Sequence, residues 1–488
     1  MTAHAAVTTE RMSRVDTAWL RMDTDANLMM IVGIWLVEPE LSLGDLRTRV
    51  EGSLLLYDRF RQRVVEDAMG ATWVEDGQFD IANHVVAETL EVAPGQAPLD
   101  ALKARVGELA ATPLNPSRPL WELRLVENLE PGRSAIITRI HHCIGDGIAL
   151  ISVMLSITDG GKPPPEKKRR TNGAAEGEGA EADWFADALL KPVTDLTIKA
   201  IGLYGDGMGR SIEFISQQVA NPTQPLAGGM EVARIGYQVI SDAAAMALMP
   251  DDSPTRLKGK ATPGKKVAWG EPLPLEDVKV IAQAFGGSIN DILLTCVAGA
   301  IGDYLRDHGE DPTGKEIRAM VPVNLRPMEQ AWKLGNRFGL VPLVLPVGIA
   351  NPVDRLAAVR ARMNELKGGY QPVMAFALLA VAGLLIKPMQ AALLNLFAKK
   401  ATAVMTNVPG PREPLKFCGR TVRQVMFWVP QSGDIGVGVS ILSYAGGVQF
   451  GLITDDTLCP DPEAIIERFQ PEFEQLLYLA LMLPWGDD

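Results

Sequence analysis

The sequence is poor in cysteine, and its few cysteines are not paired at short spacing. Only 4 cysteines occur among 488 residues, namely Cys143, Cys296, Cys418 and Cys459, and no CxxC pair is present. This pattern predicts neither a disulfide framework nor a structural zinc site, and it favours a reducing cytoplasmic environment. The first ten residues contain no basic segment followed by an apolar stretch, so we expect no secretory signal.

Basic charge and long apolar runs are also scarce. The 47 Lys and Arg residues are outnumbered by 59 Asp and Glu residues, which gives a formal net charge of -12. Because a nucleic-acid partner requires a basic face, we expect no nucleic-acid binding. The longest apolar stretch, Val373 to Ile386, ends at Lys387-Pro388 and falls short of the roughly 20 residues of a spanning helix.

The composition that remains is that of a folded globular protein with a large core. Apolar residues make up 47% of the chain and charged residues 22%. Since a single core stops growing at about 250–300 residues, a chain of 488 predicts two domains. Helical periodicity alternates with short β-branched runs, as in 43–56 and 134–140, which predicts an α/β fold with mixed sheets.

A change of composition in the middle of the chain indicates the domain boundaries. Residues 160–183 are rich in Pro, Gly, Ala and charge, which predicts a flexible linker, and 184–249 have a helical apolar pattern. We therefore divide the chain into an N-terminal domain (1–160), a linker with connecting helices (161–255) and a C-terminal domain (256–488). The last domain is expected to contain strands and one long helix, at 317–323, 340–346, 401–406, 435–444, 448–453 and 461–481.

The most informative stretch places two of the five histidines at the end of an apolar strand, before a turn with two glycines: His141-His142-Cys143-Ile144-Gly145-Asp146-Gly147. A rigid strand that ends in such a turn can present an imidazole to a cleft. With an unperturbed pKa of about 6.5, imidazole can take a hydroxyl proton near neutrality. One histidine would be the base and the other a wall of the site, while Asp146 would fix the turn by hydrogen bonds or through an arginine.

Two other interpretations of this stretch remain open. A histidine at a strand end is often structural. His141, His142 and Asp146 could also ligate zinc, although no further histidine or cysteine cluster has suitable spacing, so we predict no metal.

The heptapeptide matches the HHxxxDG motif of the acyltransferase superfamily that includes chloramphenicol acetyltransferase, carnitine acyltransferases and peptide-synthetase condensation domains. Further motifs over nearly the whole chain resemble the bacterial wax ester synthase/diacylglycerol acyltransferase family. They are Ser13 to Leu20, Trp73, Phe79-Asp80, His84, Pro119 to Glu122, Asn290-Asp291, Val321 to Arg326, Leu334 to Arg337 and Thr406 to Pro411. The resemblance implies two chloramphenicol acetyltransferase-like domains with an active-site channel between them.

The same resemblance implies transfer of a long-chain acyl group from acyl-CoA to a fatty alcohol or diacylglycerol, without a bound cofactor. His142 would be the general base, and the hydroxyl would attack the thioester directly, with no acyl-enzyme. Asp146 would be chiefly structural, and Gly147 would permit the turn.

Four further residues enter the predicted site through the resemblance. Asn290 becomes a candidate donor to the thioester oxyanion, with Asp291 beside it, although an Asn-Asp pair is also typical of a helix N-cap. Pro119 and Trp121 would shape the acyl tunnel, but Trp121 by itself is most simply a core aromatic. Residues 407–411 are interpreted as a loop that ends a strand and supports the site.

Two segments could contact lipid. Residues 373–397, followed by Lys399-Lys400, could lie at a membrane or lipid-droplet surface, or form a buried helical hairpin. The basic cluster 167–170 could bind lipid headgroups or the phosphates of coenzyme A, or be a solvated loop. The expected location is therefore cytoplasmic, with a peripheral place on the inner membrane face or on lipid inclusions as an alternative.

Two rival functions stay open. A condensation-type enzyme would take its acyl group from a carrier protein instead of acyl-CoA. A non-catalytic lipid-binding or droplet-coating protein would have no use for His142.

Overall fold

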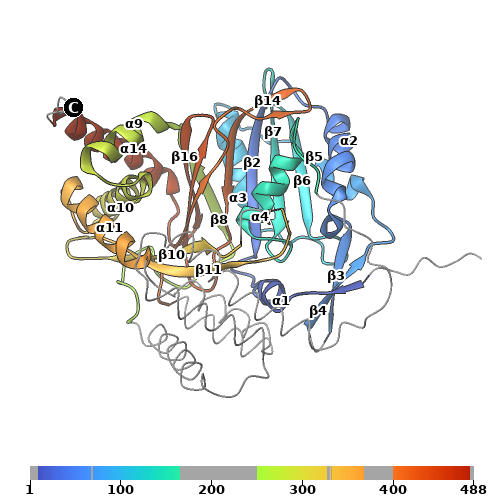
Figure 1. Ribbon diagram of the computed structural model, residues 1–488, viewed down its shortest axis with the longest axis horizontal. Coiled ribbons are helices and arrows are strands. Elements are labelled where there is room, and N and C mark those ends of the chain that lie inside the picture. Colours follow the sequence, from blue (N-terminus) through green and yellow to red (C-terminus); the bar gives the residue numbers. More distant parts are fainter. Residues whose placement is uncertain are drawn as a thin grey trace, which may run out of the picture.

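A computed structural model describes residues 9–67, 70–164, 250–326, 330, 332–367 and 399–483. Four predictions lie outside these residues: most of the linker, the connecting helices 184–249, the apolar segment 373–397 and the basic cluster 167–170. The described residues form an α/β protein with three sheets (Figure 1).

The first large sheet has six strands in the order β13-β14-β2-β7-β6-β5. Its centre is a pair of antiparallel, almost completely buried strands, β2 and β7, which are rich in Ile and Val as strand propensity requires. Its strands are β2 (Met30–Glu38), β5 (Val85–Ala87), β6 (Trp121–Glu130), β7 (Arg133–His141), β13 (Lys416–Phe417) and β14 (Arg420–Trp428).

Two strands of this sheet come from the C-terminal half of the chain. β14 pairs antiparallel with β2, with Phe427 opposite Gly33, and an ion pair joins Arg423 to Glu38 across 385 positions. The domain boundaries predicted from the sequence did not anticipate that strands after residue 256 join the first sheet. Because β14 covers an edge that β2 would otherwise expose, the two halves share one continuous structure.

Helices cover both faces of the first sheet. The side chains of α3 pack with alternate residues of β2 and β7, such as Ile34 and Ile137, while α2 and α4 cover the opposite face. A small sheet, β1-β4-β3, lies beside α1 at the lower end in Figure 1. These elements are α1 (Arg14–Arg21), α2 (Leu43–Ser53), α3 (Pro98–Ala110), α4 (Gly147–Ser156), β1 (Thr9–Arg11), β3 (Gln62–Asp67) and β4 (Gly70–Glu75), with 3-10 turns at Leu54–Leu56, Asp58–Phe60 and Ile81–Asn83.

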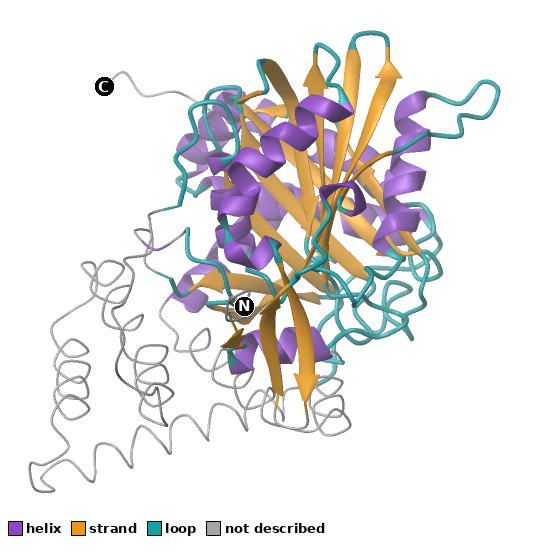
Figure 2. Cartoon of the chain, turned by 90° about the vertical axis from the view of Figure 1, so that its right-hand side faces the viewer, coloured by secondary structure: helices purple, strands orange, loops and turns teal. Residues whose placement is uncertain are grey.

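The second large sheet has the order β11-β10-β12-β15-β16-β8, with β9 pairing with β16. Four helices pack on it and form the largest apolar core with it, and Figure 2 shows helices lying along the strands of the sheets. The strands are β8 (Lys265–Trp269), β9 (Leu273–Pro274), β10 (Ile317–Asn324), β11 (Phe338–Leu345), β12 (Ala403–Pro409), β15 (Val437–Tyr444) and β16 (Gly447–Asp455). The helices are α9 (Leu275–Phe285), α10 (Ile289–Asp307), α11 (Pro352–Lys367) and α14 (Pro462–Met482).

The strands and the long helix predicted in the second half are confirmed, with small shifts at their ends. One detail was wrong. Residues 407–409 were interpreted as loop, but they continue β12, because Asn407, Val408 and Pro409 stay in parallel register with 441–443 of β15. Only Gly410-Pro411 leave the strand.

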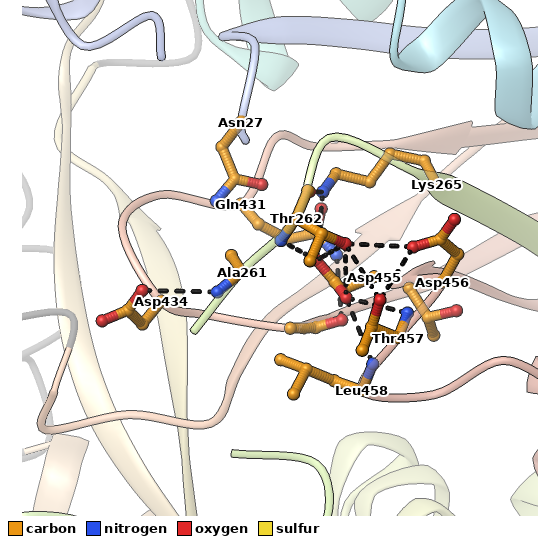
Figure 3. Close-up of polar contacts among 12 residues, drawn as sticks. Asn27, Ala261, Thr262, Lys265, Gln431, Asp434, Asp455, Asp456, Thr457 and Leu458 are labelled. Carbon is orange, nitrogen blue, oxygen red and sulfur yellow. Dashed lines mark hydrogen bonds and ion pairs between the residues drawn. The ribbon is translucent and has the colours of Figure 1, made fainter. Parts of the chain in front are cut away.

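A buried carboxylate holds the segment before β8 against the end of β16 in the second sheet. Asp455, at the end of β16, is fully buried and accepts hydrogen bonds from the backbone and hydroxyl of Thr262 and from the backbone N–H groups of Thr457 and Leu458 (Figure 3). Lys265 Nζ lies 3.7 Å from Asp455 Oδ2. Because so many donors satisfy this carboxylate, we interpret the cluster as structural.

Among the described residues, no single helix combines the length and apolar composition needed to cross a membrane, and the α9–α10 pair that does so jointly is bent by 98°.

Candidate active site

The HHxxxDG residues form the turn between β7 and α4. His141 ends β7 opposite Met30, and the backbone N–H of His142 donates to the carbonyl of Met29 at 2.7 Å. Four residues later Asp146 is the N-cap of α4, where its Oδ1 accepts from the N–H of Ala149 at 2.9 Å. The strand therefore fixes one side of the turn and the helix cap fixes the other.

The ring of His142 is buried beside two aromatic side chains that also contact each other. It stacks on Trp19 with centroids 4.2 Å apart and an interplanar angle of 13°, and the Phe338 ring lies 5.5 Å away. Only 3% of the residue is exposed. Burial lowers the pKa of His142 to about 4, so the imidazole is neutral near pH 7 and able to accept a proton.

His141 has a different environment on the opposite face of the strand. Its Nδ1 accepts from the N–H of Cys143 at 3.1 Å, and its Nε2 lies 3.3 Å from a carboxylate oxygen of Asp23. With both nitrogens in contact with polar groups, the His141 ring supports the turn. Its role as a wall of the site stays a prediction.

Asp146 joins the turn to the second half of the chain. Its Oδ2 lies 3.1 Å from Nη2 of Arg326 and accepts from the N–H of Arg337 at 2.9 Å. Both members of the Asp146–Arg326 pair are buried. Asp146 therefore fixes the turn through hydrogen bonds to backbone N–H groups and through its ion pair with Arg326.

A second set of hydrogen bonds holds the backbone of His142, the candidate base. Asn336 donates from Nδ2 both to the carbonyl of His142 and to Asp16 Oδ1, each at 2.8 Å. Next to it, Gly335 forms a parallel bridge with Gly145 and accepts from Nη2 of Arg326 at 2.5 Å. Residues of the second half thus determine where the His142 turn lies.

Several buried polar atoms of this network have no hydrogen-bond partner within the described parts of the chain. They are Nδ1 of His142, Nε1 of Trp19, Oδ1 of Asn336, and Nε and Nη1 of Arg326. An unsatisfied buried polar group costs about 1–3 kcal/mol, so proteins rarely gather several of them without a use. These atoms make the surroundings of His142 a strong candidate for a polar reaction site.

Asn290 and Asp291 lie at the start of α10. Asp291 Oδ2 accepts from the N–H of Ser288, whose Oγ accepts from the N–H of Asp291, so the two form a capping box. The alternative of a helix N-terminus is therefore confirmed, with Ser288 as the N-cap. Asn290 is exposed, and its Oδ1 accepts from Asn407 at 2.7 Å, which leaves its Nδ2 able to donate.

Within the described residues, Asn290 makes no hydrogen bond to the His142 ring, so its oxyanion role stays a prediction. Substrate binding by Asp291 stays a prediction as well.

Pro119 and Trp121 lie in the core of the first domain. Trp121 is 1% exposed, donates from Nε1 to the carbonyl of Phe60 at 2.9 Å and stacks on His84. Pro119 is buried as well. These contacts are those of a core aromatic, and neither residue lines the cavity described next, so their contribution to a tunnel stays a prediction.

Gly147 lines a cavity between α4 and the first sheet that holds about 720 Å³, part of it open to solvent. A Cβ on Gly147 would meet no atom within 4 Å, and the residue is not in the left-handed region. The turn therefore does not require glycine, contrary to the expectation. The missing side chain instead leaves the cavity open at the start of α4. His142 itself is not among the lining residues, although Ile140 and Gly147 on either side of it are.

Among the described residues, no three His, Cys, Asp or Glu side chains are grouped as a metal site would require.

Asp16, Arg326 and Asn336 lie within the motifs quoted above, but no role was predicted for them. The structure places all three around the His142 turn. Their place within the family motifs was the available signal.

Replacement of Gly335 by alanine tests whether contacts from the second half of the chain position the His142 turn. Gly335 has φ of +98°, and a Cβ there would lie 3.3 Å from Asp16 Oδ2. We expect Gly335→Ala to lower the free energy of unfolding by about 1–2 kcal/mol and to reduce activity as well. Gly309→Ala, also at positive φ but with open space around its Cβ, should lose similar stability and keep full activity. Equal activity of the two variants would contradict the role given to Gly335.

Family models match most of the chain. The model described as "wax ester synthase/diacylglycerol acyltransferase catalytic domain" matches residues 12–293, and the "WS/DGAT C-terminal domain" matches 334–477. The chain is 28% identical to the probable diacylglycerol O-acyltransferase Tgs1 of Mycobacterium tuberculosis over 481 residues, which cover 96% of both chains.

Two solved structures share the fold. A wax ester synthase/diacylglycerol acyltransferase from Marinobacter aquaeolei superposes with a TM-score of 0.64 at 18% identity, covering 97% of this chain and 100% of that one. The first condensation domain of the calcium-dependent antibiotic synthetase gives 0.56 at 14% identity, covering 97% of each chain. These likenesses confirm the predicted two-domain, chloramphenicol acetyltransferase-like α/β fold.

Proposed function

Because the chain belongs to the wax ester synthase/diacylglycerol acyltransferase family and is an acyltransferase, we propose that it transfers a long-chain acyl group from acyl-CoA to a fatty alcohol or diacylglycerol, with His142 as general base. The products would be wax esters or triacylglycerols. The name of the Mycobacterium tuberculosis relative supports diacylglycerol as an acceptor.

The observation that carries this proposal is the environment of His142. Its imidazole is kept neutral by burial, its backbone is clamped from the second half, and unpartnered polar atoms lie around it. A neutral imidazole can accept a proton, and the unpartnered donors and acceptors offer hydrogen bonds to a hydroxyl or a thioester.

In the proposed reaction, His142 accepts the hydroxyl proton as the alcohol oxygen attacks the thioester carbon. The tetrahedral intermediate then collapses, the carbon–sulfur bond breaks, and the imidazolium returns the proton to the coenzyme A thiolate. Asn290 would donate to the oxyanion from Nδ2, an interaction that can contribute about 2.7–4 kcal/mol. Since the thioester supplies the activated acyl group, the reaction requires no cofactor or metal.

We also propose a cytoplasmic location, with access to lipid at the inner membrane face or at inclusions. The four cysteines are free thiols, as a reducing compartment allows.

The low pKa of His142 predicts an unusual pH dependence. The base works only when unprotonated, so kcat/KM should fall as the pH drops through about 4, instead of through the usual value near 6.5. A pH–rate profile of kcat/KM, with circular dichroism at each pH to follow folding, measures this. An acidic limb at pH 6–7 in a folded enzyme would contradict the stated environment of His142.

The proposed function is tested by incubating the purified full chain with one long-chain acyl-CoA and a panel of fatty alcohols and diacylglycerol, followed by identification of the esters. Formation of wax ester or triacylglycerol with release of coenzyme A supports the proposal. If acyl groups transfer only from a carrier protein, the condensation-type rival is correct. Lipid binding without any ester would favour the lipid-binding or droplet-coating rival.

A further inference from the structure

Trp19 lies on the side of α1 that faces His142. Asp16 and Trp19 are both buried residues of this helix, and because they are three positions apart they lie on the same side of it. Asp16 Oδ1 accepts from Nδ2 of Asn336, and the same Nδ2 donates to the carbonyl of His142. One helix is thus linked to the backbone of His142 through Asn336 and contacts its ring through Trp19, so the relative position of the two rings is fixed.

The indole of Trp19 covers one face of the imidazole. The two rings are almost parallel, with centroids 4.2 Å apart, and both residues are buried. Phe338 lies farther from the imidazole, at 5.5 Å, and is tilted by 39°. A cation within about 6 Å of an aromatic centroid is attracted by the negative face of the ring, most strongly by tryptophan and more strongly where water is excluded. The arrangement therefore suits a positive charge on the imidazole.

The imidazole of His142 has little other support for such a charge. Burial lowers its pKa to about 4, because the site disfavours the protonated ring. In a Ser-His-Asp triad the Nδ1–H of the histidine donates to a carboxylate, which stabilises the imidazolium. Nδ1 of His142 has no hydrogen-bond partner among the residues that the structure describes.

The charged groups near His142 are directed elsewhere. Asp146 attracts a charge on the ring from a distance, but its two oxygens serve the cap of α4 and the ion pair with the second half of the chain. Asp16 accepts two hydrogen bonds from Asn336. His141 repels a positive charge on the His142 ring. Within the described residues, the group in direct contact with a face of the imidazole is therefore the indole and not a carboxylate.

We propose that Trp19 stabilises the imidazolium form of His142 through a cation–π interaction, and so lowers the energy of the transition state in which the hydroxyl proton reaches the imidazole. The ring gains its charge only as the proton arrives, so the attraction is stronger in the transition state than in the ground state, and this difference accelerates the reaction. The inference rests on the proposed function, and it adds a residue that acts through His142.

The test places fluorinated tryptophans at position 19 of the full chain. Each fluorine weakens the negative face of the indole with almost no change of shape, so the packing of α1 is kept. For each protein, kcat is measured as release of coenzyme A from one acyl-CoA with one alcohol. The matched control carries the same series at Trp428, which is also buried with an indole N–H that has no partner among the described residues, but which packs against Trp269.

We expect kcat to fall with each fluorine added at position 19, by about 10–30-fold when the attraction is lost completely, and to stay at the wild-type value in the Trp428 series. Trp19→Phe keeps a weaker ring face and should retain more activity than Trp19→Leu. A kcat that does not depend on fluorine at position 19 would overturn the inference. Fluorine also makes the indole N–H a stronger donor, so a kcat that rises with fluorine would overturn it in favour of a hydrogen bond from Nε1.

A measurement without substrates separates this inference from the proposed function. The protonated fraction of His142 is followed by nitrogen NMR of the 5 histidines, with His142→Gln to assign its signal, at acidic pH values where circular dichroism shows a folded chain. This fraction should be lower with fluorinated Trp19 than in the wild type, because the imidazolium loses its attraction. That result without any ester formation would mean that the proposed function fails while the interaction stands. Ester formation with an unchanged protonated fraction would remove the interaction alone.

Discussion

Replacement of His142 by glutamine is expected to lower kcat by about 10²–10⁴-fold, the usual contribution of a positioned general base. Glutamine is neutral and polar, and it can occupy the space beside Trp19, but it cannot take the hydroxyl proton. The measurement is release of coenzyme A from acyl-CoA in the presence of a long-chain alcohol, with binding of both substrates followed separately.

The matched control is His308→Gln. His308 lies at the end of α10, where Nδ1 contacts the carbonyl of Tyr304 and Nε2 contacts Asp461, and it has no contact with the His142 turn. This variant should keep full activity. A folded His142→Gln protein that esterifies at the wild-type rate would remove His142 from the mechanism and would favour the non-catalytic rival.

Replacement of Asp146 by alanine is expected to lower the free energy of unfolding by about 3–5 kcal/mol, because it leaves the guanidinium of Arg326 buried without its partner. The loss of the α4 N-cap adds to this. Urea denaturation followed by circular dichroism measures the change.

Two further variants separate the causes. Asp146→Asn keeps an oxygen for the N–H of Ala149 but no charge, so it should be less destabilised than Asp146→Ala. Glu276→Ala removes an exposed carboxylate paired with Lys279 and should cost less than about 1 kcal/mol. If Asp146→Ala were as mild as Glu276→Ala, the turn would not depend on the ion pair with Arg326.

The sequence was sufficient to predict features that depend on neighbouring residues. The strand before His141 follows from its β-branched residues, and the long helix from 461 follows from its apolar spacing. The family resemblance, now confirmed by both family models, depended on such short motifs.

Pairings between distant segments could not be predicted, because periodicity carries no information on the partner of a strand. The exchange of β14 into the first sheet is one example, and the contact of Asn336 with His142 across 194 positions is another. The stacking of Trp121 on His84, 37 positions away, is a third.

The late position of β14 in the sequence also affects how the protein folds during translation. A ribosome synthesises β2 long before residues 420–428, so the nascent chain carries an unpaired, apolar strand edge through most of translation. The first sheet is not complete until β14 has emerged and paired with β2. A fragment that stops before residue 420 should therefore be prone to aggregate, and expressing the first half on its own should yield little usable enzyme.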